Sequence, residues 1–455
     1  KNHHHHKKMN RMRSSLLFLL LLLFIVVVYC SPPQGTSNRL LVVLEKDQYK
    51  ATHSAFFGQL EDFGYTLHFS SVFDDNALER YGEYEYSGLI LFVSSSNEFG
   101  TLLDIDAILE FVDASHNVFI ATSRSASSSV KELMSEFGVD FSTAQKRTQV
   151  VDHLHYDRNL DASSGKNSVI YSSNKSSSLF GEEDEEKILF HGVGHQLAPD
   201  SDLVFSILSA HDSAYTYPLK ENAPVLAGNT ISLVSGFQAR NNARVVLAGS
   251  IDLFSNKYFA AQVHTGDGHV ELSSGNAHFS KQLLAWMLKE KGLLRAINAK
   301  HHRVGEEEQP DIYKITESIV FSVDIQEWNG SEWVPYVADD IQLEFRMLDP
   351  YIRQNLVLVD PSKGSYALEF RIPDVYGVYT FSIEYTRIGY SNLHLNMVEP
   401  IRPFRHDEYE RFIPAAYPYY VGAFSMIIGF IIFSFIFFFS LGGPTMTTTQ
   451  QKKKQ

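Results

Sequence analysis

Short apolar runs and amphipathic stretches alternate along the first 300 residues. The apolar runs predict buried strands at Arg39–Leu44, Tyr65–Phe69, Leu89–Val93, Val118–Ala121 and Arg244–Ser250. The amphipathic stretches predict helices at Thr52–Phe63, Ile105–Ala114, Ser127–Phe137 and Phe279–Lys291. Strands that alternate with helices are typical of a parallel sheet covered by helices. The pattern therefore predicts an α/β region over residues 38–298.

After His301 the apolar residues recur at every second position. Four runs show this period, beginning at Ile319, Ile341, Tyr366 and Tyr379. Asn329-Gly330 follows the first run, and this dipeptide favours a tight hairpin turn. Strands with one polar face predict an antiparallel β-sandwich over residues 299–402, joined by a linker at 403–414 to the segment that follows.

The C-terminal segment is apolar enough to cross a membrane. No charged side chain occurs from Phe412 to Gln451, and Tyr419–Leu441 is almost wholly apolar. We expect a single transmembrane helix at 415–441. The tail at 442–455 contains Lys452 and Lys453, and lysines mark the cytosolic side of a span. Their position also matches the dilysine pattern that returns membrane proteins to the endoplasmic reticulum (ER).

The N-terminus predicts secretion. Residues 1–8 are interpreted as an upstream extension, and 9–31 as a signal peptide with a basic start and an apolar core at Leu16–Val28. Cleavage near Cys30 would leave a type I membrane protein with most of its chain in the lumen. An uncleaved anchor is the alternative, although the apolar core is short for a span.

Composition narrows the class of protein. About 380 residues separate the two apolar segments, enough for two or three domains. The formal net charge of −14 argues against a nucleic-acid surface. Cys30 is the only cysteine, so the mature chain would contain neither a disulfide nor a thiol nucleophile. Its domains must therefore rely on full hydrophobic cores.

Histidine pairs are the first candidates for chemistry. A sheet of the flavodoxin- or amidotransferase-like kind binds ligands at its strand ends, but the sequence has no G-x-G-x-x-G, P-loop or G-x-S-x-G motif. His153 and His155 can share one strand face, and His191 and His195 form a second pair. Neither pair belongs to a zinc motif, so we favour surface or hydrogen-bonded histidines, and we predict no cofactor or metal site.

Charged residues near one predicted strand are the second candidates. Asp252 follows the strand that ends at Ser250, and Arg240 and Arg244 lie just before and at its start. They either line a pocket or form buried structural ion pairs. The sequence leaves both readings open.

Two further features concern modification and assembly. Asn174 and Asn329 each begin an N-x-[ST] triplet and are predicted glycosylation acceptors in exposed turns. In the apolar helix, Gly422, Ser425 and Gly429 share one face, and small residues let membrane helices approach closely. We expect this face to pack against a partner helix, ordinary helix composition being the alternative.

Several longer segments carry a family resemblance. They are Thr52–Phe57, Gly236–Arg244, Gly249–Phe254, His301–Glu306, Asp340–Phe345, Pro373–Val378 and Glu410–Tyr420. In this order they resemble the 48 kDa subunit family of the ER oligosaccharyltransferase. That complex transfers a preassembled glycan from dolichyl diphosphate to Asn of Asn-X-Ser/Thr in nascent proteins.

The resemblance implies a subunit that is required for assembly and is not itself the catalyst. It implies partners among the other subunits, including a polytopic catalytic subunit, and leaves contact with donor glycan or acceptor peptide open. No catalytic residue is carried over. The alternatives are a lumenal cargo receptor and a free-standing lumenal hydrolase or transferase that uses Asp252 or the histidines.

Overall fold

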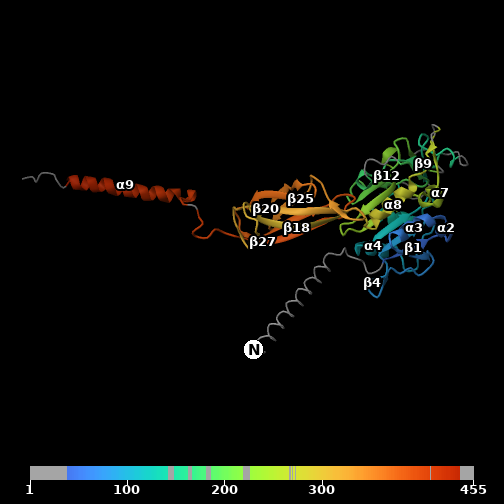
Figure 1. Cartoon of the computed structure of the whole chain (residues 1–455), viewed down its shortest axis with the longest axis horizontal. Helices are drawn as coiled ribbons and strands as arrows, with labels where there is room; N and C mark the ends of the chain where they lie inside the picture. The colour runs from blue at the N-terminus through green and yellow to red at the C-terminus, as the bar shows by residue number, and fades with distance from the viewer. Residues whose placement is uncertain are drawn as a thin grey trace, which may run out of the picture.

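The computed structural model describes residues 38–141, 148–161, 167–180, 186–218, 226–265, 268, 270–271, 273–409 and 411–440. The predicted extension, signal peptide and cytosolic tail, with Lys452 and Lys453, lie outside these residues. An α/β domain, a β domain and a long helix follow one another along the longest axis of the molecule (Figure 1).

A seven-stranded sheet forms the centre of the α/β domain, in the order β12-β14-β15-β6-β5-β1-β2. Its strands are β1 (Arg39–Leu44), β2 (Thr66–Ser71), β5 (Gly88–Phe92), β6 (Asn117–Ala121), β12 (Val204–Ser209), β14 (Ser232–Gln238) and β15 (Arg244–Ala248). The five strands from β15 to β2 are parallel, and β14 runs antiparallel to both of its neighbours. The predicted parallel sheet is confirmed.

Both faces of this sheet are buried. Leu40 and Val42 of β1 contribute to one apolar core, and Leu41 and Val43 contribute to the core on the opposite face. Because both faces are covered, the strands are apolar at nearly every position. The helices that supply the two cores are α3 (Ser54–Asp62), α7 (Asn256–Phe259) and α8 (Asn276–Met287) on one face, and α4 (Ile105–Asp113) and α5 (Ser128–Glu136) on the other.

Capping side chains set several helix ends. Asp104 accepts a hydrogen bond from the Ala107 N–H at the start of α4, and Ser127 accepts one from the Val130 N–H at the start of α5. The helix predicted at Thr52–Phe63 is wrong at its N-terminal end. It divides at His53 into α2 (Gln48–Thr52) and α3.

Smaller elements complete the α/β domain around the sheet. They are β3 (Glu79–Arg80), β4 (Glu83–Tyr84), β7 (Val139–Asp140), β8 (Thr148–Val151), β9 (Ile170–Ser172), α6 (Ser177–Phe180), β10 (Ile188–Phe190), β11 (Gln196–Leu197), β13 (Tyr215–Pro218), η1 (Gly228–Thr230), η2 (Asp252–Phe254), β16 (Val263–His264) and β17 (Val270–Glu271). Five antiparallel two-stranded pairs arise among these strands.

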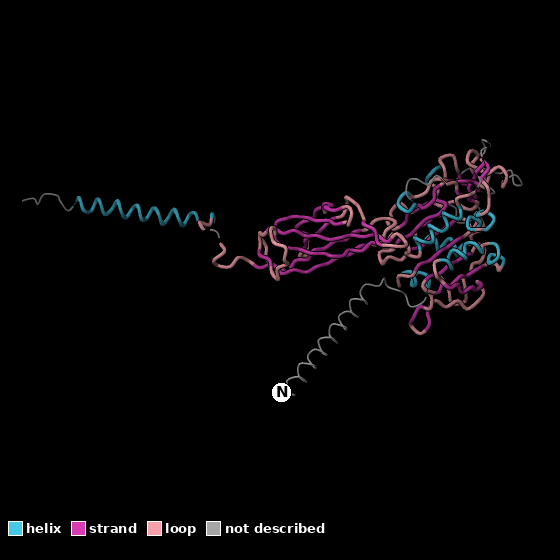
Figure 2. Tube along the Cα trace, in the orientation of Figure 1, coloured by secondary structure: helices cyan, strands magenta, loops and turns pink. Residues whose placement is uncertain are grey.

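The β domain is a sandwich of two sheets (Figure 2). One sheet has the order β18-β20-β25-β24 with β21 on β20, and the other has the order β19-β27-β26-β22-β23. The strands are β18 (Leu293–Arg303), β19 (Tyr313–Lys314), β20 (Ser318–Trp328), β21 (Trp333–Pro335), β22 (Gln342–Arg346), β23 (Pro350–Asn355), β24 (Val357–Asp360), β25 (Ser365–Arg371), β26 (Gly377–Tyr385) and β27 (Leu393–Arg402). Alternate residues face a shared core, which confirms the predicted sandwich.

The predicted hairpin at Asn329-Gly330 is confirmed, because Trp328 of β20 pairs with Trp333 of β21. The first strand of the sandwich, β18, already begins at Leu293, six residues before the predicted limit of 299. The β domain therefore begins within the region predicted as α/β, directly after α8.

A buried arginine holds the joint between the two domains. Arg244 is 1% exposed and donates hydrogen bonds to the carbonyl oxygens of Trp286 (2.5 Å), Lys291 (2.9 Å) and Gly292 (2.9 Å). The Trp286 indole N–H in turn donates to the carbonyl of Gly389 in the β domain. The end of α8, the start of β18 and the 386–392 loop are therefore fastened together.

The long helix α9 (Tyr417–Ser440) follows a short 3-10 turn, η3 (Pro414–Ala416). Together they form one segment of 27 residues, whose most apolar window of 18 residues has a mean hydropathy of 2.5 and no buried face within the described chain. Their length and composition fit a transmembrane helix, in agreement with the span predicted at 415–441.

Candidate functional site

Ligand sites in α/β folds commonly form at the carboxyl ends of the parallel strands. After β1 the chain turns outward to β2 and then returns to the other side of β1 as β5. Open α/β sheets bind ligands in the crevice where the strand order reverses in this way. In this chain the crevice lies between the ends of β1 and β5.

Glu45 lies at this reversal of strand order. It directly follows β1, and its carboxylate accepts hydrogen bonds from the backbone N–H groups of Ser94 (2.6 Å) and Ser95 (3.1 Å) after β5, and from the Ser95 hydroxyl. Backbone N–H groups at such a position commonly hold an anionic ligand. Here a side chain of the protein itself takes the place of that anion.

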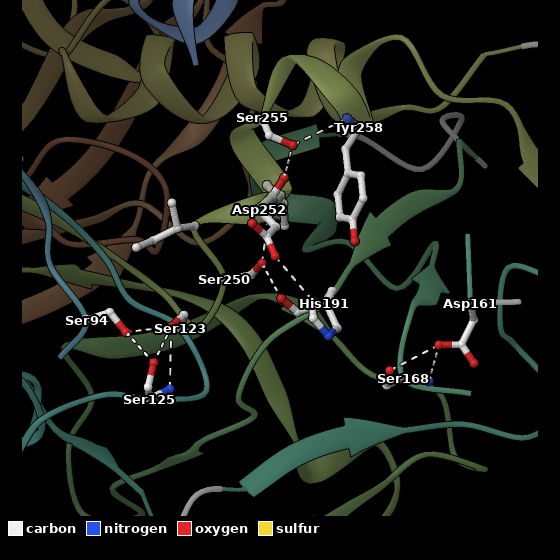
Figure 3. A network of polar contacts seen from close by, with 12 residues as sticks. Ser94, Ser123, Ser125, Asp161, Ser168, His191, Ser250, Asp252, Ser255 and Tyr258 are labelled. Carbon is white, nitrogen blue, oxygen red and sulfur yellow. Dashed lines mark hydrogen bonds and ion pairs between the residues drawn. The ribbon is translucent and has the colours of Figure 1, made fainter. Parts of the chain in front are cut away.

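Serine hydroxyls continue this network across the sheet edge (Figure 3). Ser94 Oγ lies 2.5 Å from Ser123 Oγ and 3.2 Å from Ser125 Oγ, at the ends of β5 and β6. The hydroxyls bond one another, and the figure shows them apart from the second cluster, around Asp252. Polar groups at the sheet edge are thus largely satisfied by each other.

Asp252 and His191 form an ion pair at the end of β15. His191 Nδ1 lies 3.2 Å from Asp252 Oδ2, and the Asp252 side chain is 57% exposed. Burial raises the pKa of Asp252, but the hydrogen bond and charge of His191, together with His53 and Lys257, outweigh it, so the net pKa is lowered.

Ser250 does not complete a nucleophilic triad with this pair. Its hydroxyl is fully buried and donates to the backbone carbonyl of His191 (2.7 Å), not to the imidazole. A serine nucleophile needs a base within hydrogen-bond reach of its hydroxyl. The hydrogen bonds around Asp252 therefore stabilise the end of the strand and do not activate a nucleophile.

Tyr49 of α2 and His53, which directly follows α2, lie beside the same strand ends. His53 Nε2 lies 3.2 Å from the carbonyl oxygen of Ile251, and burial lowers the pKa of His53. Burial, with the charges of Glu45 and Asp252, raises the pKa of Tyr49 to about 12. Both side chains are thus neutral at pH 7 and pack against the strand ends.

The prediction that His153 and His155 share a strand face is wrong. Strand β8 ends at Val151, and Asp152 accepts hydrogen bonds from the N–H groups of Leu154 and His155 in a tight turn. His155 Nδ1 then contacts Asp152 (3.1 Å), and His153 Nε2 contacts the Tyr215 hydroxyl (2.8 Å). The favoured interpretation, hydrogen-bonded histidines, fits this arrangement.

The second histidine pair is also separated. His195 is fully buried, 2.6 Å from the Ser235 hydroxyl, and burial lowers its pKa to about 3, whereas His191 faces Asp252. Within the described residues, no group of three or more His, Cys, Asp or Glu side chains is placed to hold a metal ion.

The sequence allowed two interpretations of Arg240 and Arg244, a pocket lining or buried ion pairs, and neither holds for both residues. Arg240 is exposed, and Arg244 bonds backbone carbonyls and no carboxylate. A small cleft of about 40 Å³ does lie at the domain joint, with Gln238, Arg240 and Asn392 among its lining residues. The side-chain amide oxygens of Gln238 and Asn392 are buried without a hydrogen-bond partner, so the pocket interpretation holds for Arg240 alone.

Comparison with known proteins decides the family. Residues 33–290 match the model of the OST48 N-terminal domain, and residues 301–441 match the model of the OST48 middle domain. The chain belongs to the OST48 family.

Curated relatives of this OST48-family chain share its length. A protein of Arabidopsis thaliana is 41% identical over 89% of this chain and 93% of its own, and one of Danio rerio is 37% identical over 88% and 91%. One of Drosophila melanogaster is 36% identical over 92% and 95%. Each is named the 48 kDa subunit of dolichyl-diphosphooligosaccharide–protein glycosyltransferase.

Among solved structures, a ThuA-like protein of Parabacteroides merdae aligns with 55% of the chain and 88% of its own length. The sequence identity is 13% and the TM-score is 0.30, which is too low to support an argument.

The predicted glycosylation acceptors of the OST48-family chain differ in their surroundings. Asn329 lies in the exposed hairpin turn, where its side-chain oxygen accepts from the N–H groups of Ser331 and Glu332. The Asn174 side-chain amide donates to the Ala210 carbonyl. The turn leaves the amide nitrogen of Asn329 the more accessible of the two.

The predicted packing face lies along α9. Ser425 donates its hydroxyl to the Gly422 carbonyl (2.8 Å), which satisfies it within the helix. A Cβ added at Gly422 or Gly429 would meet no atom within 4 Å. The face is therefore open to a neighbour.

Proposed function

We propose that this chain is a non-catalytic subunit that an ER oligosaccharyltransferase complex needs for its assembly. The complex transfers a preassembled glycan from dolichyl diphosphate to Asn of Asn-X-Ser/Thr in nascent proteins. Membership of the OST48 family and the names of the curated relatives support the role in the complex.

One observation supports the non-catalytic part of the proposal. Glu45 occupies the N–H groups of Ser94 and Ser95 at the point where an α/β enzyme would bind its ligand. A glycosyl donor with a diphosphate would have to displace a carboxylate that is already held by two charge-assisted hydrogen bonds. The sheet edge is thus better suited to structural support than to catalysis.

The proposed topology places both folded domains in the ER lumen. The apolar helix α9 supplies the membrane anchor. Retrieval through Lys452 and Lys453, and glycans on Asn174 and Asn329, belong to the same proposal. The hairpin at Asn329 is a suitable acceptor because its residues 329–332 are exposed.

The proposed partners are the other subunits of the complex, including a polytopic catalytic subunit. Gly422, Ser425 and Gly429 form the proposed contact within the bilayer. Small side chains let two helix backbones approach and gain close dispersion contacts. The two lumenal domains would then add contacts outside the membrane.

Gentle-detergent purification of the full-length chain tests the proposal. We expect the polytopic catalytic subunit to co-purify, and we expect glycan transfer to an acceptor peptide only in the fractions that contain it. Transfer by the purified chain alone would contradict the non-catalytic role, and recovery without any other subunit would contradict the role in assembly.

A further inference from the structure

Exposed apolar side chains gather at one end of the β domain. Leu348 in the turn between β22 and β23 is 91% exposed, and Tyr376 in the loop before β26 is 64% exposed. Val375, Val378 and Tyr351 are also exposed. We call these five residues the apolar tip. A folded domain rarely exposes such a group without a function.

Contacts between the two loops make the apolar tip a single surface. A Cβ on Gly377 would lie 2.6 Å from Met347 Sδ, so the two loops touch directly. The Tyr379 hydroxyl donates to the Val375 carbonyl (3.0 Å), and the Tyr351 ring packs on the Tyr379 ring at 5.4 Å. Because these contacts fix the backbone, the apolar side chains are held outward and cannot fold into the core.

The apolar tip lies at the end of the domain from which the chain leaves for α9. Gly377 pairs with Ile401, near the last residue of β27, and β27 ends at Arg402. The opposite end of the sandwich contacts the α/β domain (Figure 1). Only 14 residues separate Arg402 from α9, so this end stays within about 50 Å of the helix even if the linker is fully extended.

The linker has the same chemical character. Tyr409, Phe412 and Ile413 are exposed in it, and Tyr417 and Tyr419 are exposed at the start of α9. Tyrosine is enriched where a membrane meets water, because its ring is apolar and its hydroxyl is polar. Exposed aromatic and aliphatic side chains therefore recur between the tip and the membrane helix, interspersed with charged residues such as Arg405 and Asp407.

Charges near the apolar tip argue against recognition of anionic lipid. Two of the neighbouring cations are already paired, Arg346 with Glu384 (3.2 Å) and Arg353 with Glu344, and Arg371 donates to the Thr316 carbonyl. Asp349 and Asp374 are exposed beside Leu348 and Tyr376. These carboxylates suit the ammonium groups of zwitterionic headgroups and would repel an anionic surface.

We propose that the apolar tip rests in the headgroup region of the lumenal leaflet, on zwitterionic lipid. A turn and a loop that protrude are shaped to enter lipid, whereas a protein partner would need a matching hollow. The contact would hold the β domain at a fixed height and tilt above the bilayer. This inference rests on the proposed membrane anchor α9, and it does not depend on the non-catalytic role.

Photo-crosslinking in the native membrane tests this contact. The photoreactive residue p-benzoylphenylalanine replaces Leu348 in the full-length chain, which assembles in the cell and is then irradiated. Val337, 58% exposed and located between β21 and β22, receives the same residue as a matched control. Both side chains are exposed, so neither replacement disturbs the core. Mass spectrometry of the labelled peptides identifies the adducts, and carbonate extraction checks separately that α9 is embedded.

We expect phospholipid adducts at position 348 and none at position 337, with choline or ethanolamine lipids the main species. Adducts to another polypeptide at position 348 would overturn the proposal and assign the apolar tip to a subunit interface. Absence of adducts at position 348, or equal lipid adducts at both positions, would overturn it as well. Loss of the chain on carbonate extraction would instead refute the anchor itself.

Discussion

Replacing Arg244 with methionine should loosen the joint between the two lumenal domains. Methionine has a similar length and can still pack on Trp286, over which the Arg244 guanidinium lies at 5.2 Å. It cannot donate a hydrogen bond. The Lys291 carbonyl oxygen would then be left without its Arg244 donor, whereas the Trp286 and Gly292 oxygens would keep the backbone N–H groups of Lys289 and Ser391 and lose only the bond to Arg244.

The size of the effect follows from these three oxygens. The Lys291 oxygen, left without that donor, costs about 1–3 kcal/mol, and the lost hydrogen bonds at the Trp286 and Gly292 oxygens cost about 0.5–1.5 kcal/mol each, which gives a gross loss of about 2–6 kcal/mol. Removal of a buried charge returns part of this, because burial already lowers the pKa of Arg244 to about 9. A net loss of about 3 kcal/mol would lower the Tm of a domain of this size by about 6–12 °C.

Thermal unfolding of the purified full-length chain, followed by tryptophan fluorescence, measures this shift. Trp286 itself sits at the joint and reports on it. Arg240→Met is the matched control, since the Arg240 side chain is exposed. The Tm of Arg244→Lys should lie between those of wild type and Arg244→Met, because an ammonium group cannot span three acceptors as a guanidinium does. If Arg244→Met unfolds at the same temperature as Arg240→Met and wild type, the buried guanidinium does not hold the joint.

Three further predictions concern the membrane helix, the tail and pH. Gly429→Leu should cost about 1–2 kcal/mol of helix contact and release partners in harsher detergent, whereas Phe437→Leu should not; equal co-purification would mean that the small-residue face contacts lipid. Serine in place of Lys452 and Lys453 should let a reporter with only the span and tail leave the ER, and equal retention would show that the lysines carry no signal. The folded state holds His195 at a pKa of about 3 against 6.5 when unfolded, so stability present above pH 6.5 should fall as pH is lowered, by about 2 kcal/mol at pH 5. Denaturant unfolding at several pH values should show a shallower fall for His195→Gln, and an unchanged slope would refute this assignment.

The sequence predicts the two folds well because burial leaves a direct pattern in it. Leu40–Val43 is continuously apolar since both faces of β1 are buried. Ile319 to Ile325 alternate since only one face of β20 is buried. Such patterns depend on which side of an element meets the core, and that information is local.

Two of the misses depend on contacts that are distant in the sequence. The helix breaks at His53, whose ring reaches the carbonyl of Ile251, 198 residues away. Glu45 was passed over because its partners, Ser94 and Ser95, come about 50 residues later. The signal that points to Glu45 is its position as an acidic residue directly after the first strand of a sheet whose strand order reverses there. The Asp152 turn was missed because a short apolar run does not show where its strand ends.

Glycan transfer per assembled complex is the most direct test of the non-catalytic role. The variant to measure combines Glu45→Gln, His191→Gln and Asp252→Asn in the full-length chain, within a purified complex whose amount is quantified through its catalytic subunit. Asp252 is more than half exposed, so its replacement should not disturb the core. We predict the same transfer rate per complex as in wild type, even if less complex assembles. A large loss of transfer at equal amounts of intact complex would contradict the account and place chemistry at this sheet edge.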